Sequence, residues 1–278
     1  MRSLINRYHP ITGDPFLRDD SYWELKPCEV LKPYIRCFWG TLRPLEPMVS
    51  DKPALPGLVI PDTCMDIIFD INYSQNSYTA TFCTLDEHSY RTGCQPSTET
   101  TGTFGIRFYA WTASLFADLD FHGLKNQAIP ADVPFKRLTA QLAPLLLEEP
   151  SLAGKAAVAE AYFLGVLDGI RPDPNLLNAV DYLLQTDGRA WISDLCDHTA
   201  LSPRKLERVF QRHMGISPKS FASLARYQLL WQDVAVHASL NLLDAVEKYG
   251  YTDQAHLLND FKRRHLMTPS EALHYARR

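Results

Sequence analysis

The sequence lacks several features that define large classes of proteins. It has no run of about 18 apolar residues, the length that a membrane-spanning helix needs. Its start, MRSLINRYHP, is polar and has no apolar core of the kind found in signal peptides. It has no nucleophile elbow and no phosphate-binding loop. We therefore expect a soluble, cytoplasmic protein that is not an enzyme, has no cofactor and does not enter a membrane.

The six cysteines include no C-x-x-C pair, and the ligand spacing of structural zinc sites is absent. Reduced, mostly buried thiols are the simpler interpretation for a chain of this size. A metal or redox site built from Cys64, Cys83, Cys94 and His88 stays open as the alternative.

Positive charge is also scarce, since the formal net charge is -4. The average hides a difference along the chain. From residue 175 onward there are 13 Lys and Arg against 11 Asp and Glu, whereas the preceding residues carry 15 against 21. Cations gather at Arg204–Lys219 and again at Lys262–Arg264. Such local clusters, more than the total, decide whether a protein attracts an anionic partner.

Residues 1–135 are predicted to be mostly β. LVIPDTCMDIIFDI and TTGTFGIRFYAW are rich in β-branched and aromatic residues, and SYTATFCTL alternates polar and apolar positions. Residues 136–174 have helical spacing and end at RPDP, so they form either a linker or a dimerisation region. Residues 175–278 are helical throughout. The chain is thus an α+β multidomain protein.

One pattern occurs twice in the helical part. FQRHMGISP at 210–218 returns as FKRRHLMTP at 261–269, an offset of 51 residues. At the same offset Leu206 matches Leu257, and Ser202 matches Asp253, both good N-caps. Each unit is therefore a short helix, a tight turn and a second helix with an outward face, at about 191–215 and 242–266. A generic helical array with solvated charges is the alternative.

These units resemble the two helix-turn-helix units of AraC/XylS-family transcription regulators. ISDLCDHTALSPRKLERVFQRHMGISPKSF carries the resemblance in the first unit, and DAVEKYGYTDQAHLLNDFKRRHLMTPSEAL carries it in the second. The front domain is more loosely similar to the sensor domains of some members, through PDTCMDIIFD and GIRFYAW. The resemblance implies a regulator that binds double-stranded DNA, with a cupin-like or related N-terminal sensor domain for a small molecule. A homodimer, and RNA polymerase as partner of an activator, would fit it too.

The resemblance also assigns the DNA contacts. Positions that match the family's base readers are Arg204, Glu207 and Arg208 in the first unit and Gln254, Ala255, Leu258 and Asn259 in the second. Contacts to phosphate are expected from Ser202, Arg212, Lys219, Lys262, Arg263 and Arg264. The second unit departs from the family pattern at Leu258 and Asn259. We therefore expect two unequal half-sites about one helical turn apart, with the first unit dominating specificity.

The front domain offers a candidate effector site. Asp66 and Arg107 each lie inside an apolar strand, where a charged group needs a partner. They form either a structural ion pair or the polar anchors of a ligand pocket. The residues expected around such a pocket are Trp39, Cys64, Phe108 and Trp111.

Two other functions stay open: a constitutive DNA-binding protein whose front domain only dimerises, and a DNA-targeted enzyme such as an alkyl-transfer repair protein. His213, His256 and His265 are interpreted as helix-surface or packing residues.

Overall fold

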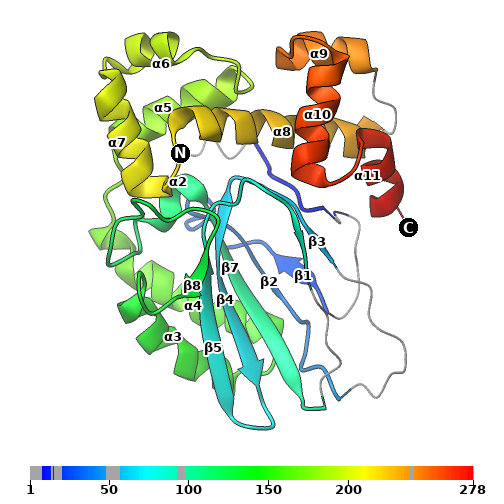
Figure 1. Ribbon diagram of the computed structural model, residues 1–278. Coiled ribbons are helices and arrows are strands. Elements are labelled where there is room, and N and C mark those ends of the chain that lie inside the picture. The colour runs from blue at the N-terminus through cyan, green and yellow to red at the C-terminus, as the bar shows by residue number, and fades with distance from the viewer. Residues whose placement is uncertain are drawn as a thin grey trace.

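The computed structural model describes residues 8–13, 15, 21–47, 57–92, 98–237 and 241–277. The first half of the chain forms β-sheets, and the second half consists of helices (Figure 1). This confirms the predicted α+β architecture with a β-rich front part and a helical C-terminal part. Among the described residues, no helix combines the length and the apolarity that a membrane span requires.

The main sheet has six antiparallel strands. Their order is β1 (Trp23–Leu25), β2 (Ile35–Gly40), β7 (Thr101–Tyr109), β4 (Cys64–Asn72), β5 (Ser77–Cys83) and β8 (Ala128–Pro130). A second sheet pairs β3 (Leu58–Val59) with β6 (Tyr90–Arg91). Within the described residues the six strands do not close into a barrel, because β1 and β8 are the two edges. A closed cupin-like barrel therefore stays a prediction.

The two faces of the main sheet differ in chemistry, because side chains alternate along each strand. One face carries Phe104, Ile106 and Phe108 of β7 together with apolar residues of β4, all buried. The helices α3 (Lys136–Glu148) and α4 (Leu152–Val166) cover this face, as Phe82–Phe135 and Phe108–Phe163 ring contacts demonstrate (Figure 1). The other face carries Asp66 and Arg107 and is called the polar face below.

Ten α-helices and one 3-10 helix follow strand β7 in the described part of the chain. The short α2 (Ala110–Ala113) comes directly after it, and the 3-10 helix η1 (Leu167–Gly169) follows α4. The remaining helices are α5 (Pro174–Gln185), α6 (Ile192–Thr199), α7 (Pro203–Met214), α8 (Pro218–His237), α9 (Leu242–Tyr249), α10 (Gln254–His265) and α11 (Pro269–Ala276).

The helix ends follow the predicted capping signals. Ser202 accepts a hydrogen bond from the Lys205 amide at the start of α7, and Asp253 accepts one from the His256 amide at the start of α10. Helix α7 stops at Gly215, whose φ of 69° suits glycine. A Cβ at Gly215 would lie 2.0 Å from the Leu124 carbonyl oxygen, so the helix end touches the front domain through bare backbone.

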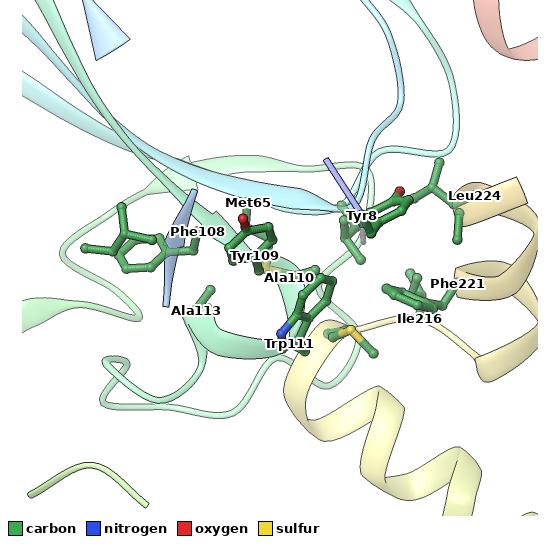
Figure 2. Packing of buried hydrophobic residues seen from close by; sticks show 14 of the residues in the cluster. Tyr8, Met65, Phe108, Tyr109, Ala110, Trp111, Ala113, Ile216, Phe221 and Leu224 are labelled. Atoms are coloured by element: carbon green, nitrogen blue, oxygen red, sulfur yellow. The ribbon is translucent and has the colours of Figure 1, made fainter. Parts of the chain in front are cut away.

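Helix α8 holds the two halves of the chain together. It runs across the end of the main sheet and connects the two helix pairs (Figure 1). Phe221 of α8 packs edge-on against Trp111 of α2 at 6.1 Å, within a buried cluster at the junction (Figure 2). The buried Gln228 donates to the Pro61 carbonyl at 2.7 Å and accepts from the Ile11 amide at 3.0 Å. The contacts between the two halves are therefore both apolar and specifically hydrogen bonded.

Candidate nucleic-acid interface and sensor face

Two helix-turn-helix pairs form the candidate nucleic-acid interface: α6 with α7, and α9 with α10. In each pair the second helix is anchored by a Leu and a Phe one turn apart, Leu206 and Phe210 in α7 and Leu257 and Phe261 in α10, all fully buried. Because side chains at i and i+4 lie on one side of a helix, the opposite side of both helices is left to solvent. The sequence repeat thus corresponds to a repeated packing arrangement.

The expected base-reading positions lie mostly on these solvent sides. In α7, Arg204, Glu207 and Arg208 are exposed, and Glu207 accepts a hydrogen bond from Gln211 at 3.2 Å. In α10, exposed positions are Gln254, Ala255 and Asn259. Leu258 is the exception, because it is half-buried and packs against the hydrophobic core.

The expected phosphate contacts divide into two groups. Ser202, Arg212, Lys219, Lys262 and Arg263 are exposed. Arg264 is buried, with 5% of its surface exposed. Its Nε donates to Asp260 at 3.4 Å, and its terminal nitrogen donates to the Ser223 hydroxyl of α8 at 2.8 Å. The expectation that Arg264 contacts phosphate is therefore wrong.

Helical spacing explains the position of Arg264. It lies seven residues after Leu257 and three after Phe261, so it belongs to the buried stripe of α10. This spacing can be read from the sequence, but the run of three cations in KRR favours an exposed position for Arg264 instead. Asp260 receives further hydrogen bonds from Arg263 at 2.6 Å and from the Tyr251 hydroxyl at 3.1 Å. Burial acts to raise the pKa of Asp260, but Arg264, Arg263 and the Tyr251 hydroxyl together hold it below its usual range.

The three singled-out histidines differ in their surroundings. His256 is exposed and contacts Thr252, and burial lowers the pKa of the fully buried His265 to about 3. His213, near the end of α7, is half-buried at the junction with the front part of the chain. Its Nδ1 lies 2.8 Å from the Ser114 hydroxyl, and its Nε2 lies 3.7 Å from Asp173.

The polar face of the sheet brings Asp66, Arg107 and Trp39 together. The Arg107 guanidinium donates to both carboxylate oxygens of Asp66, with its Nε at 3.0 and 3.2 Å and a terminal nitrogen at 3.1 Å. The Trp39 indole nitrogen donates to the same carboxylate at 2.7 Å. Asp62 contributes a second carboxylate 3.6 Å from Arg107. Asp66 and Arg107 therefore form an ion pair with bidentate geometry, which fixes the guanidinium in the middle of this face.

Burial sets the protonation of the groups around this pair. It raises the pKa of Asp62 to about 6, partly offset by Arg107, and it raises the pKa of Asp86 to about 6 with help from Asp62 and Asp66. It also raises the pKa of the Cys64 thiol and moves that of Cys83 to about 12. These cysteines are therefore protonated thiols at neutral pH.

Two residues expected at the effector site lie elsewhere. Phe108 directly follows Arg107 in β7, so its side chain points to the opposite face and packs against Phe163 under α4. Trp111 belongs to α2 and faces α8 at the junction (Figure 2). The expected site therefore reduces to Trp39, Cys64, Asp66 and Arg107. The period of two along β7 was available in the sequence, whereas the position of Trp111 was not.

The structure adds residues that the sequence did not single out. Tyr22 packs over the Trp39 ring with centroids 5.5 Å apart, and Asp62 completes the carboxylate pair around Arg107. No sequence signal distinguished either residue. Among the described residues, no three His, Cys, Asp or Glu side chains are arranged to hold a metal ion. Cys94 of the alternative metal site lies outside the described residues.

Two family models match the chain. A helix-turn-helix domain matches residues 195–274, and a domain of unknown function, DUF6597, matches residues 23–130. No curated protein matches the sequence.

Three solved structures illustrate what the chain is similar to. A probable AraC family transcriptional regulator from Rhodopseudomonas palustris CGA009 has 25% identity, covers 37% of this chain and 98% of its own, and has a TM-score of 0.33. ToxT from Vibrio cholerae O395 bound to (E)-4-(8-methylnaphthalen-1-yl)but-3-enoic acid has 11% identity, coverages of 86% and 99%, and a TM-score of 0.42. Unsaturated fatty acid bound wild-type ToxT from Vibrio cholerae strain SCE256 has 11% identity, coverages of 92% and 97%, and a TM-score of 0.40.

The two helix pairs and the matched domain define a DNA-binding regulator of the helix-turn-helix class. More specifically, the chain carries a helix-turn-helix domain of the AraC type at its C-terminal end and a DUF6597 domain ahead of it.

Proposed function

We propose that the protein is a sequence-specific transcription regulator that reads two unequal half-sites with α7 and α10. The supporting observation is that both helices bury their anchors and leave their reading positions exposed, while α8 connects the two pairs. Arg204 and Arg208 suit guanine O6 and N7, and Asn259 and Gln254 suit adenine. Helix α10 offers fewer hydrogen bonds to bases than α7, because Leu258 is half-buried and Ala255 has no polar side chain, which leaves Gln254 and Asn259 against three polar readers in α7. The first unit should therefore contribute most of the specificity.

Selection of bound sequences from a random double-stranded library tests this proposal. Arg204→Ala or Arg208→Ala should relax the selected sequence in one half-site and weaken binding by about 1–3 kcal/mol. Lys136→Ala is the matched control, since it removes an exposed cation from α3 and should leave the selected sequence unchanged. A wild-type protein that selects no sequence, or variants whose selected sequence is unaltered, would contradict the proposal.

The finer part of the proposal is that a small molecule bound on the polar face controls DNA binding. This face offers a fixed guanidinium, an indole and three carboxylates that include Asp86, and its residues Ile68 and Thr81 are only half-buried. Pockets commonly combine a few such polar anchors with apolar walls. The Asp66–Arg107 pair would then be both structural and a ligand anchor.

Substitutions on the half-buried part of the polar face test whether the protein is an effector-controlled regulator or a constitutive one. A metabolite library is first screened for compounds that raise the melting temperature and change DNA affinity. Thr81→Trp would fill the half-buried position opposite Ile68 and should abolish both effects. Ala140→Trp, at an exposed position of α3, is the control and should keep them. DNA affinity that no compound changes would favour the constitutive alternative, and hits unaffected by Thr81→Trp would place the site elsewhere.

The alkyl-transfer alternative has little chemical support. A thiolate is the nucleophile in such reactions, and burial keeps Cys37, Cys64 and Cys83 protonated by raising their pKa values.

We also propose that α4 mediates homodimerisation. Its outer side presents Ala153, Ala157, Ala161 and Leu164 to solvent, and helices that are apolar on all sides are normally buried. Leu164→Glu should convert a dimer into a monomer in analytical ultracentrifugation. Leu119→Glu, which changes a similarly exposed leucine in a loop, should not. A wild-type monomer at all concentrations would contradict this proposal.

A further inference from the structure

A cavity lies on the helical side of the front part of the chain, away from the polar face. It has a volume of about 290 Å³ and lies between the turn after α2, helix α3 and the end of α4. Its lining residues are Leu115, Phe116, Arg137, Gln141, Tyr162, Val166, Gly169 and Ile170. This volume lies near the lower limit of small-molecule sites in proteins.

The lining combines apolar walls with a few polar groups. Phe116 forms the inner wall and is held by edge-to-face contact with Phe163 at 4.9 Å. Arg137 and Gln141 are exposed, one helical turn apart on α3. Asp118 accepts from the Nε of Arg137 at 2.5 Å and is not a lining residue. The guanidinium has five N–H donors, so four others are available in principle to a second carboxylate.

The segments that form the two walls of the cavity both continue into residues that contact helix α7. On one side Leu115 follows Ser114, whose hydroxyl lies 2.8 Å from the Nδ1 of His213. On the other side Ile170 precedes the short segment that ends at Asp173, whose carboxylate lies 3.7 Å from the Nε2 of the same imidazole. Asp173 is also the N-cap of α5, accepting from the Asn175 amide. One residue of the first helix-turn-helix unit therefore contacts the segments on both sides of the cavity.

We propose that this cavity binds small aromatic carboxylates and that their binding changes the DNA affinity of the first helix-turn-helix unit through His213. A ring fits between Phe116, Tyr162 and Val166, and the carboxylate reaches Arg137 and Gln141. A ligand that alters the separation of the walls changes the positions of Ser114 and Asp173, and with them the end of α7. This site is distinct from the polar face, and only its regulatory consequence rests on the proposed DNA-binding function.

Ligand-observed fluorine NMR with 4-fluorophenylacetate tests binding without any DNA. Gly169→Leu should fill the cavity, because a Cβ at Gly169 meets no atom within 4 Å and a side chain can extend there. We expect wild-type protein to bind the probe, Gly169→Leu to bind it at least tenfold more weakly, and Gly169→Ala to bind it nearly as wild type. The alanine variant controls for the loss of glycine, and circular dichroism melting verifies that both variants fold. The uncharged 4-fluorophenylacetamide should bind at least fivefold more weakly.

The coupling is measured by fluorescence anisotropy with the selected DNA. The probe should change the DNA affinity of wild-type protein at least threefold and have no such effect on His213→Ala, which still binds the probe. His213→Asn, which can keep the contact with Ser114, should restore part of the response. Absence of probe binding to wild type, or equal binding to Gly169→Leu, overturns the cavity proposal whether or not the protein binds DNA. Probe binding that leaves DNA affinity unchanged overturns the coupling.

Discussion

Replacing Arg264 with alanine separates the internal support of α10 from its contacts to DNA. Arg264 and Lys262 are near neighbours in the cation run, but only Lys262 is exposed. The side chains of Arg264 and Asp260 are 6% and 7% exposed. Arg264→Ala should therefore reduce stability, whereas Lys262→Ala should reduce DNA affinity and leave stability nearly unchanged.

The expected loss of stability in Arg264→Ala follows from the interactions that Asp260 loses. Removing one partner of a buried ion pair costs about 3–5 kcal/mol when the other charge is left without compensation. Asp260 keeps its hydrogen bonds from Arg263 and Tyr251, so we expect a smaller loss than this range, about 2–3 kcal/mol. At roughly 2–4 °C per kcal/mol for a chain of this size, the melting temperature should fall by about 4–12 °C.

Calorimetry and salt-dependent DNA binding measure the two effects separately. Lys262→Ala should lower the slope of log affinity against log salt by about 0.9, the value for one phosphate contact, with little change in melting temperature. Arg264→Ala should melt earlier, and well below its melting temperature it should keep the wild-type salt slope. The reasoning is refuted if Arg264→Ala melts like wild type and loses affinity and salt slope as Lys262→Ala does.

Three further predictions concern buried polar groups. Burial lowers the pKa of Lys155 to about 8 in the folded protein. Between about pH 8 and 10 the unfolded chain therefore binds more protons at this residue than the folded chain does. The free energy of unfolding consequently rises with pH across that range. Lys155→Met should therefore raise the melting temperature at pH 7, by an amount that shrinks near pH 10. Burial raises the pKa values of Asp62 and Asp86 to about 6, so their contribution to stability falls as the pH rises from about 4 to 6. Asp62→Asn should make the decline in melting temperature over that range shallower, and an unchanged pH profile would contradict this. Gln228→Leu would leave the Pro61 carbonyl and the Ile11 amide without their hydrogen-bond partner. At roughly 1–3 kcal/mol for each group, the free energy of unfolding measured in urea should fall by about 2–6 kcal/mol. Gln232→Leu is the control, because Gln232 is less buried.

Local signals in the sequence were sufficient to predict the helical part. Ser202 with Pro203, Asp253 and Gly215 mark helix ends by their own chemistry, and the spacing of Leu206 and Phe210 identifies the buried side of α7. The exposed reading positions follow from that spacing. Arg264 is the exception, because its residue type favours the surface whereas its place in the periodic stripe of Leu257 and Phe261 buries it.

The front domain was less predictable because its arrangement depends on long-range contacts. The pairing of Asp66 with Arg107 requires β4 and β7 to be neighbours although 41 residues separate the two side chains. Gln228 contacts residues more than 160 positions away, and no local pattern predicts such a contact. Trp111 likewise acquires its role at the junction only when α8 packs against α2.

The spacing of the two half-sites tests the central claim most directly. If α8 holds α7 and α10 at a fixed separation, inserting five base pairs between the selected half-sites rotates one of them by about half a turn away from its helix. DNA affinity should then fall to the level of a single half-site, and inserting ten base pairs should not restore it because the units cannot move a further turn apart. Affinity that is unchanged by the five-base-pair insertion would contradict the claim that one chain reads both half-sites.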